Sequence, residues 1–398
     1  MPAETPGDAG EITFVEQPDG FTRVELALDG HPVSWLFIAH FILMIGEARV
    51  RMDGIAGVGT EEAHRKRGFS RRVLEATLDR MRRGDAALSM LYGIPNFYPK
   101  FGYATAGPDH FISLTVAGQP VALPEGWRAR AFERGDLPAV MELYDRGTAG
   151  AVGAAVRPET AWGRLLDLPG TSQDACRVLE GPDGRLRAYL WRARGCWYVG
   201  NCERAQPSAL VLGEVMADGP AAAEAALDAC QAWAAEPPAE GAVAPEQVLL
   251  AWPPEGSIAD AARCRAAQFQ ARYSACGGSM ARVMDVDRLL VALAPELTHR
   301  LRASRDGFRG RLRIDTDLGA GDLVITGEEV RFAPAGEGAA PDRVASLPQH
   351  TLAQLALGAF PPVDVLGRLD GPLSAPAREL LVALFPMRHP HMHLPDRF

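Results

Sequence analysis

The chain has 398 residues, too many for one ordinary hydrophobic core, so we expect two or three domains. Hydrophobic residues make up 47% of it and charged residues 23%, as in soluble globular proteins. The formal net charge of −9 argues against a general nucleic-acid binder, which would carry a basic domain, and is compatible with cationic amine ligands.

The ends and the cysteines predict a cytoplasmic protein without membrane contact. Residues 1–12 contain three acidic side chains and no apolar run, so no signal peptide is predicted. The longest apolar run, Trp35–Ile45, is too short to cross a bilayer. The six cysteines lie in the middle of the chain, between Cys176 and Cys276, without a Cys-x-x-Cys pair, which favours reduced thiols.

The first segment, residues 1–118, alternates expected strands and helices. In its most informative part, Gly54–Leu74, a strand runs into a basic turn, and Arg71–Met81 then carries apolar residues at helical spacing. The other expected strands are Glu11–Val15, Phe21–Leu28, Glu47–Asp53, Ala87–Tyr92 and Phe111–Val116.

The basic turn Arg65–Ser70 is a candidate phosphate site. A turn that opens a helix directs several backbone N–H groups at one point, where the helix dipole adds positive charge. Gly68 lets the main chain approach a ligand closely. The alternative is a solvated basic turn with no ligand.

The second segment, residues 119–285, follows a stretch rich in proline and glycine at 118–126, which we interpret as a linker. Asp136 and Pro138 mark a helix start, and Ala221–Trp233 reads as an alanine-rich helix. Gly184–Arg194 and Cys196–Asn201 are expected to form a hairpin. The order of elements repeats that of the first segment without a basic turn, so we interpret the second segment as a divergent copy that does not bind the ligand of that turn.

The third segment, residues 286–398, differs in character. Its expected helices are Asp287–Leu293, Pro295–Leu301, Leu347–Leu357 and Ala375–Phe385, and its expected strands are Gly310–Asp315, Asp322–Thr326 and Glu329–Ala333. Near its end, His389, His391 and His393 alternate and would share one face of a strand. A metal site and a place in an amine pocket remain open for them. Surface exposure is favoured, and no metal is predicted.

Several motifs resemble known families. Arg65-x-x-Gly68-x-Ser70 resembles the Arg/Gln-x-x-Gly-x-Gly/Ala loop of the GCN5-related N-acetyltransferases (GNATs), and Tyr98–Tyr103 resembles the Tyr-x-x-Phe-Gly-Phe/Tyr segment after their fifth strand. Leu312–Asp317 and Leu352–Gly358 resemble the sterol-carrier-protein-like fold, an antiparallel sheet covered by helices. This three-part order, with the ending Asp396–Phe398, is similar along nearly the whole chain to the Eis-type (enhanced intracellular survival) acetyltransferases.

The resemblance implies a mixed α/β and α+β architecture of two tandem GNAT folds, each a mixed central sheet flanked by helices, and an α+β sterol-carrier-like domain. Residues 1–118 would be the catalytic domain, 119–285 the degenerate copy, and 286–398 the domain that supplies the C-terminus. By resemblance alone, we also expect a homo-oligomer, specifically a hexamer.

The same resemblance implies site residues for acetyl-CoA as co-substrate, with no metal. Tyr98 would be the general acid, although packing among neighbouring aromatics is its alternative. The α-carboxylate of Phe398 would be the base, unless the end of the chain is merely frayed. His64 would be structural. The cofactor would be bound by Val58, Thr60, Arg65, Lys66, Arg67, Gly68, Phe69, Ser70 and Asn96, and the amine pocket walled by Trp35, Phe37 and His40, unless these three only pack within a helix.

The function predicted from the sequence is transfer of an acetyl group from acetyl-CoA to a primary amine, such as a lysine side chain, a polyamine-like or an aminoglycoside-like compound. Two alternatives stay open: a transferase for longer acyl or aminoacyl groups, and a non-catalytic protein that binds a lipid or another ligand.

Overall fold

The computed structural model describes residues 10–94, 96–119, 121–167, 175–238, 243–273, 278–304 and 307–398. The first nine residues of the N-terminal stretch, Pro120 of the expected linker and Cys276 lie outside these ranges. The chain forms two compact units, one of residues 1–107, 273–388 and 398, the other of residues 108–272 and 389–397. Within the described ranges, no helix has the length and apolar character needed to cross a membrane. The five cysteines found there are free thiols.

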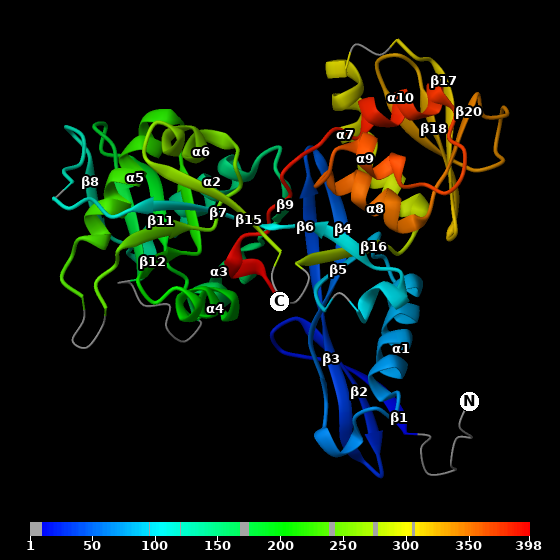
Figure 1. The fold of residues 1–398 in the computed structure, drawn as a ribbon, viewed down its shortest axis with the longest axis horizontal. Coiled ribbons are helices and arrows are strands. Elements are labelled where there is room, and N and C mark those ends of the chain that lie inside the picture. Colours follow the sequence, from blue (N-terminus) through cyan, green and yellow to red (C-terminus); the bar gives the residue numbers. More distant parts are fainter. Residues whose placement is uncertain are drawn as a thin grey trace. The chain divides into compact units, whose positions relative to one another are not determined.

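The first unit is built around a mixed sheet (Figure 1). Neighbouring strands from β1 to β4 are antiparallel, β4 and β5 are parallel, and β16 is antiparallel to both β5 and β6. The order across the sheet is β1 (Glu11–Glu16), β2 (Phe21–Leu28), β3 (His31–Ile45), β4 (Ala48–Thr60), β5 (Leu88–Tyr92), β16 (Ser279–Val283) and β6 (Ala104–Gly107).

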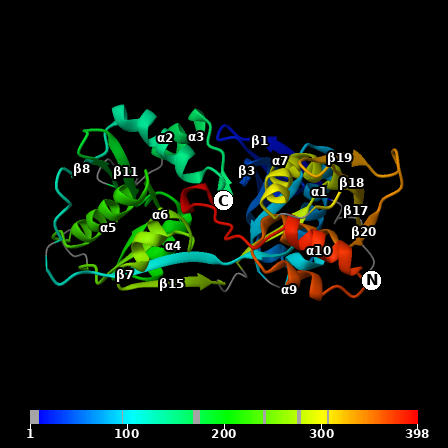
Figure 2. The same ribbon diagram turned by 90° about the horizontal axis from the view of Figure 1, so that it is seen from above.

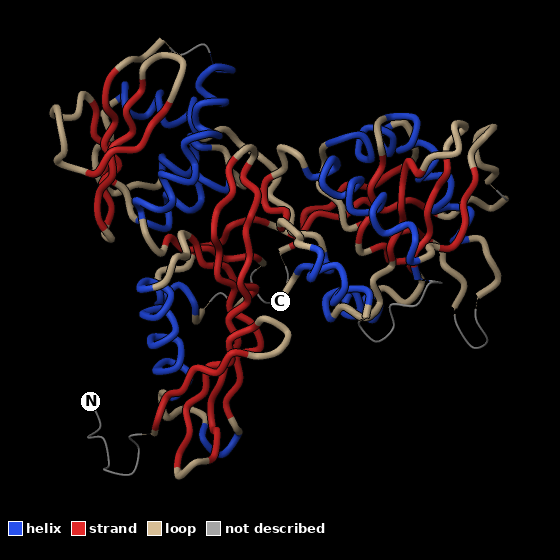
Figure 3. Tube along the Cα trace, turned by 180° about the vertical axis from the view of Figure 1, so that it is seen from behind, coloured by secondary structure: helices blue, strands red, loops and turns tan. Residues whose placement is uncertain are grey.

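Helix α1 (Phe69–Arg83) connects the two parallel strands and covers one face of the sheet (Figures 1 and 3). Its apolar residues at helical spacing, such as Val73, Leu74 and Leu78, are buried against alternating residues of β2 and β3. The helix ends at Gly84, whose N–H bonds to the carbonyls of the last turn. Helix α1 and strands β1, β2, β4 and β5 agree with the elements expected from the sequence, whereas β3, β6 and β16 were not among the expected strands.

The C-terminal part of the first unit has its own sheet, in the order β19 (Val330–Pro334), β18 (Gly319–Ile325), β17 (Gly310–Thr316) and β20 (Arg343–Ser346). The expected antiparallel sheet is corrected to a mixed one, because β20 returns parallel to β17. Its helices are α7 (Val286–Ser304), α8 (Gln349–Leu357), α9 (Pro362–Gly367) and α10 (Ala375–Leu384).

Helix α7 is continuous where the sequence predicted two helices. Pro295 lies inside it and cannot donate the usual backbone hydrogen bond. Leu290, Leu293 and Leu297 are nevertheless fully buried on both sides of the proline. Their packing outweighs the single missing bond and keeps the two halves in one helix.

The second unit contains two four-stranded sheets, in the orders β13-β11-β10-β8 and β12-β14-β7-β15. Its strands are β7 (Asp109–Thr115), β8 (Arg128–Ala131), β10 (Cys176–Glu180), β11 (Leu186–Trp191), β12 (Ala209–Leu212), β13 (Glu214–Ala217), β14 (Gln247–Leu250) and β15 (Ala267–Arg272). β12 and β13 follow each other directly in the chain, and β12 is parallel to β14. If β13 and β12 are treated as one interrupted strand, the two sheets join into the order β8, β10, β11, β13/β12, β14, β7, β15, which corresponds to the order β1, β2, β3, β4, β5, β16, β6 of the first unit. Each order contains one parallel pair, β12–β14 in the second unit and β4–β5 in the first.

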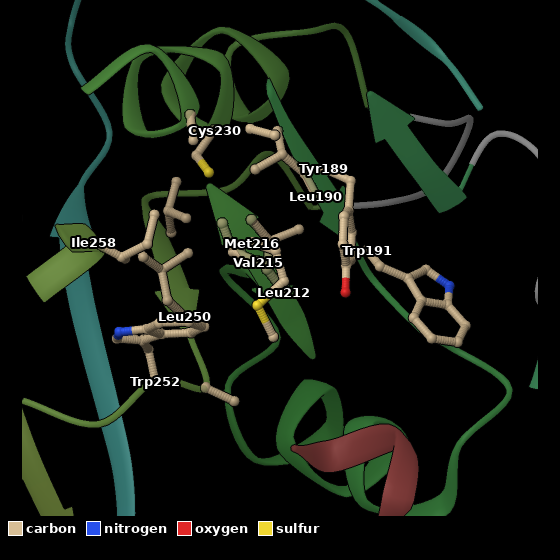
Figure 4. Packing of buried hydrophobic residues seen from close by; sticks show 14 of the residues in the cluster. Tyr189, Leu190, Trp191, Leu212, Val215, Met216, Cys230, Leu250, Trp252 and Ile258 are labelled. Atoms are coloured by element: carbon tan, nitrogen blue, oxygen red, sulfur yellow. The ribbon is translucent and has the colours of Figure 1, made fainter. Parts of the chain in front are cut away.

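The helices of the second unit are α2 (Leu137–Thr148), α3 (Glu159–Leu166), α4 (Trp197–Ala205), α5 (Pro220–Ala234) and α6 (Gly256–Arg263). Helices α5 and α6 lie side by side (Figures 1 and 2). Buried side chains of β11, β13, α5, β14 and α6, including Tyr189, Met216 and Cys230, form the core (Figure 4).

Two observations differ from the sequence-based segments. Strand β7, from the expected first segment, pairs with β14 and β15 of the second unit, and β16, from the expected second segment, pairs with β5 and β6 of the first. The expected strand Cys196–Asn201 is wrong, because these residues begin helix α4. That helix places Glu203 against Arg192 and Arg194, two ion pairs that a strand would not make in this register.

Candidate active site

The parallel strands β4 and β5 separate along their length. Their pairing covers Met52–Ile55 and Leu88–Leu91, but β4 continues to Thr60, still paired with β3. A shift in the β3–β4 register lies in this extension, where Gly57 has a φ of +54°. Among the described residues, the β5-side edge of residues 56–60 has no strand partner. This edge, which includes Val58 and Thr60, is suited to hydrogen-bond an extended ligand.

The basic turn opens α1. Gly68 precedes the helix with a φ of +85°, and no other atom lies within 4 Å of where a Cβ on Gly68 would be. Lys66 has a φ of +65°, which is unusual for a residue with a side chain. The first N–H groups of a helix have no partner inside it, so those at the start of α1 face this turn. The turn thus combines an accessible backbone with the positive end of a helix.

The side chains of the turn differ in accessibility. Arg65, Lys66 and Arg67 are exposed, and Ser70 is partly exposed. The ring of Phe69 is 2% exposed and belongs to the core, so only its backbone can contact a ligand. These side chains fit a pyrophosphate held by main-chain N–H groups with cations around it.

His64 directly precedes this turn, as the last residue of the short 3-10 helix Glu62–His64. Its Nδ1 is 3.2 Å from a guanidinium nitrogen of Arg67, and its Nε2 is 3.9 Å from the carboxylate of Glu61. These contacts agree with the structural role expected for it.

Tyr98 lies just beyond the end of β5. It begins a short 3-10 helix, Tyr98–Phe101, and is 8% exposed. Its ring packs directly on Gly93, where a Cβ would overlap it. Phe97 contacts the ring edge at a centroid distance of 5.1 Å, and Asn96 is exposed in the preceding turn.

Tyr103, at the other end of this segment, is a structural residue. Its hydroxyl is 2.7 Å from Ser89 Oγ, which donates to the carbonyl of Asp53 at 2.8 Å. Burial raises the pKa of Tyr103 well above its usual range. This hydroxyl is therefore neutral and engaged in joining β4, β5 and the Tyr98 segment.

Phe398 belongs to the first unit. Its ring lies 5.4 Å from that of Phe41 and 5.8 Å from that of Tyr92, measured between centroids. It packs on the backbone of Gly54, where a Cβ would overlap it. Tyr92 was not predicted as a site residue, and a glycine inside a strand, such as Gly54, is the signal that indicates a close approach of this kind.

The three expected wall residues are not brought together, and they lie on strand β3 instead of the helix considered as their alternative. Trp35 packs on Gly59, with the site of a Cβ 2.7 Å from the indole, and Phe37 packs on Gly57. Both therefore lie beside the extension of β4. His40 does not.

His40 is directed to the opposite face of the sheet from Phe41, because neighbouring strand residues alternate. Its Nδ1 is 2.7 Å from Asp53 Oδ1 and its Nε2 is 3.0 Å from Thr22 Oγ1. The hydrogen bond with Asp53 raises the pKa of His40. The expectation that His40 shares one pocket wall with Phe37 is corrected by this alternation.

Residues 389–397 are part of the second unit, where they are largely buried. His391 and His393 are 5% and 4% exposed, so the favoured surface placement is wrong for them. Asp396 accepts two hydrogen bonds from Arg157, at 2.7 and 2.8 Å, and Arg157 also bonds Glu214. Within the part of the chain that the structure describes, no group of three His, Cys, Asp or Glu side chains is arranged to hold a metal ion.

Comparisons with known proteins bear on the fold that carries these residues. Residues 23–106 match the family model described as "Acetyltransferase (GNAT) domain". No curated protein matches the sequence.

Among solved structures, a GCN5-related N-acetyltransferase from Kribbella flavida is 20% identical, with a TM-score of 0.66, over 94% of this chain and 87% of that one. A protein of unknown function from Enterococcus faecalis, described as a probable N-acyltransferase, is 14% identical with a TM-score of 0.70 over 95% and 89%. Eis1 from Mycobacterium abscessus is 15% identical with a TM-score of 0.60 over 94% and 90%. The first unit thus contains a GNAT acetyltransferase domain within residues 23–106, and the chain as a whole shares the fold of these proteins.

Proposed function

We propose that this protein is an N-acetyltransferase that transfers the acetyl group of acetyl-CoA to a primary amine. The observation that carries the proposal is the separation of β4 and β5 beside the start of α1, with Tyr98 and Phe398 both packed at the end of β5. A thioester arm entering between the strands would be directed at these two residues.

Coenzyme A would be held mainly by backbone groups. The extension of β4, with Val58 and Thr60, would pair with the pantetheine arm, and Asn96 lies in the turn near the opposite strand. The N–H groups at the start of α1 would hold the pyrophosphate, with Arg65, Lys66 and Arg67 supplying positive charge. The exposed turn and the open space around Gly68 fit such a group.

The reaction needs two proton transfers. As the amine nitrogen forms its bond to the acetyl carbon, the bond from that carbon to sulfur breaks and the sulfur leaves as a thiolate. Tyr98 would give its proton to this thiolate; a free phenol has an ordinary pKa of ~10 and a free thiol one of ~8.5. The amine's proton would pass to the α-carboxylate of Phe398, directly or through a water.

The remaining parts of the molecule have supporting roles in this proposal. The second unit would be the divergent copy that does not bind the cofactor. Only two residues separate β13 from α5, and α5 begins with Pro220, which has no N–H to offer a phosphate. The C-terminal part would be the sterol-carrier-like domain that supplies Phe398, within a cytoplasmic homo-oligomer, a hexamer by resemblance.

The first experiment is a thiol-release assay with acetyl-CoA and a panel of primary amines, including lysine peptides, polyamines and aminoglycosides. Acetyl-CoA should release thiol with at least one amine. Faster release with longer thioesters would support the alternative acyltransferase instead. Absence of release with every amine and thioester would favour the non-catalytic ligand-binding alternative.

Tyr98→Phe tests the proposed acid, because it keeps the ring and removes only the hydroxyl. Turnover should fall by roughly 100- to 10,000-fold, the usual range for general acid catalysis, with unchanged melting temperature. A fall smaller than about threefold would reduce Tyr98 to a packing residue.

Adding a few glycines after Phe398 tests the proposed base, because the carboxylate would move out of place. Deleting Phe398 would shift it by ~3.3–3.6 Å. Both changes should lower turnover sharply and leave coenzyme A affinity intact. An N-terminal extension serves as the control, and full activity in the C-terminally extended protein would place the base elsewhere.

A further inference from the structure

The segment that carries Tyr98 is held from outside by two side chains. Its last carbonyls, those of Phe101 and Gly102, accept hydrogen bonds from Arg282 at 2.5 Å and from Gln349 at 2.6 Å. Arg282 lies on β16, whereas Gln349 is the first residue of α8, in the C-terminal part of the unit. Both donors are nearly fully buried.

Gln349 is fixed by hydrogen bonds on its side-chain oxygen, its side-chain NH2 and its backbone N–H. Its Oε1 accepts the N–H of Val283 at 2.8 Å, so its amide NH2 must be the group that faces the carbonyl of Gly102. Its own backbone N–H is bonded to Asp317 at 2.6 Å. The side chain therefore ties β16 to the Tyr98 segment in one orientation.

The path from Gln349 to Tyr98 is short. Gly102 and Tyr103 donate their backbone N–H groups to carbonyls of the same turn, and the bond from Tyr103 to the carbonyl of Tyr98 measures 3.4 Å. Gly102 has a φ of +80°, and a Cβ there would be 2.8 Å from the Gln349 amide nitrogen. A shift of Gly102 thus moves the backbone of Tyr98 directly.

Packing alone does not hold this side of the segment. Pro99, Gly102 and Tyr103 line an open pocket of about 800 Å³ together with residues of α8 and α9. Because the segment faces an open pocket there, its hydrogen bonds to Gln349 and Arg282 carry more of its positioning than they would in a packed core.

We propose that Gln349 is a positioning residue for the reaction, which holds the Tyr98 hydroxyl at the point where the thiolate leaves. The inference rests on the role proposed for Tyr98 and extends it. The C-terminal part would serve catalysis twice, through its last residue and through the start of α8.

The test compares Gln349→Met with Gln354→Met. Gln354 lies on the same helix and donates in the same way to the carbonyl of Thr105, at 2.9 Å, but outside the Tyr98 segment. Gln349→Met should lower kcat by about 10- to 100-fold and leave the KM for acetyl-CoA within about twofold, because displacing a reacting group by about 1 Å has effects of this size. Gln354→Met should leave both values close to those of the unaltered protein.

Gln349→Glu supplies a second readout, which a purely structural role would not give. While it is neutral, the introduced carboxyl group can still donate a hydrogen bond to the carbonyl of Gly102. Its ionised form has no proton to donate, and its charged oxygen repels the carbonyl oxygen of Gly102. The kcat of this variant, relative to the unaltered protein, should therefore fall as the pH rises and recover as it is lowered. This variant also decides the matter if Gln349→Met does not fold.

The double variant Tyr98→Phe with Gln349→Met shows whether Gln349 acts through Tyr98. In the Tyr98→Phe background, Gln349→Met should cost less than about threefold in kcat. Equal kcat values for Gln349→Met and Gln354→Met, or an unchanged pH profile for Gln349→Glu, would overturn the inference but leave the proposed function standing. Full activity in Tyr98→Phe alone would overturn the acid assignment and this inference with it.

Discussion

Gly54 makes room for the side chain of Phe398 on the sheet. A single methyl group at this position would overlap the Phe398 ring, which also lies between the rings of Phe41 and Tyr92. Gly93 gives Tyr98 the same close approach. Two glycines thus set the positions of both residues to which we assign proton transfer.

Gly54→Ala should therefore displace Phe398 and lower turnover at least tenfold without weakening coenzyme A binding, which we assign to the turn at Gly68 and to residues 56–60 of β4. Overpacking of this kind also costs about 1–3 kcal/mol of stability. Steady-state kinetics and calorimetry with coenzyme A measure both effects. Gly163→Ala, in helix α3 with open space around it, is the control and should be neutral. Unaltered turnover in Gly54→Ala would show that Phe398 need not lie there.

At the scale of single residues, the sequence predicts those site residues that belong to contiguous motifs. Tyr98 and the turn from Arg65 to Ser70 were recognisable because each motif is contiguous. The position of the Phe398 ring was not recognisable, because its partners Phe41, Gly54 and Tyr92 lie far from it in the sequence. Only the pairing of their strands brings these partners together. His40 was misplaced for a related reason: its face depends on the alternation of a strand that the sequence left open to a helical reading.

Among the elements, the start of α1 has the clearest consequence for binding. Gly68 adopts a left-handed φ that a β-branched side chain tolerates poorly, although the space around it is open. At position 68, glycine thus supplies a left-handed backbone angle and an unobstructed approach for a ligand.

Gly68→Val should weaken coenzyme A binding by more than tenfold, or ~1.4 kcal/mol, by changing the turn and occupying the anion's approach. Gly68→Asn is the matched variant, because asparagine accepts left-handed angles more readily, and it should weaken binding less. Isothermal calorimetry gives both affinities. Equal affinity in the valine variant and the unaltered protein would remove the pyrophosphate from this turn.

Helix α1 was predicted because apolar spacing persists over several turns, and α5 because its sequence is rich in alanine. The sequence patterns divided α7 in two and did not assign β3 to a strand. Residues 196–201 fit a strand or a helix equally well, and the ion pairs of Glu203 that accompany α4 come from outside that stretch. Whether β20 runs parallel or antiparallel to β17 depends on the path of the chain between them, which no local sequence pattern encodes.

In the molecule as a whole, the buried cluster around Arg157 holds the residues before the C-terminus within the second unit. Arg157 bonds both Asp396 and Glu214, and its guanidinium lies 4.0 Å from the centroid of the Tyr144 ring. Tyr189 also donates to Glu214 at 2.6 Å. A single buried guanidinium thus serves two buried carboxylates, and the Tyr189 hydroxyl gives Glu214 a further hydrogen bond.

Arg157→Met would leave two buried carboxylates without their cation and should lower the free energy of unfolding by about 3–5 kcal/mol. Urea unfolding followed by tryptophan fluorescence measures the change, since Trp162 adjoins the guanidinium. The exposed pair Arg134–Asp167 is the control, and Arg134→Ala should change stability by less than about 1 kcal/mol. Equal stability in the two variants would contradict the importance of the cluster.

The buried histidines of the second unit predict a pH dependence. Burial lowers the pKa of His110 to about 4, that of His393 to about 3, and that of His391 well below its usual value. The unfolded chain, with histidine values near ~6.5, then binds more protons than the folded one below that pH, so stability is lost as the pH falls from about 6.5 toward 3.

Each of these histidines should contribute a slope of about 1.4 kcal/mol per pH unit in that range. Urea unfolding at pH 7.5 and at pH 5.5 measures the difference. His393→Leu should lower the slope of stability against pH by about 1.4 kcal/mol per pH unit, the contribution of one proton, whereas the same change at exposed His31 should leave the slope unchanged. Equal stability at both values would show that these side chains are protonated when folded.

Strands β7 and β16 have a further consequence for how this chain can be divided. Residues 1–118, cut at the boundary that the sequence suggests, would carry β5 and β6 without the strand that lies between them, together with an unpaired β7. Both would expose edges prone to aggregation. Each unit thus takes a strand from the stretch of sequence assigned to the other, so the chain cannot be divided at residue 118 into two parts that each keep a complete sheet.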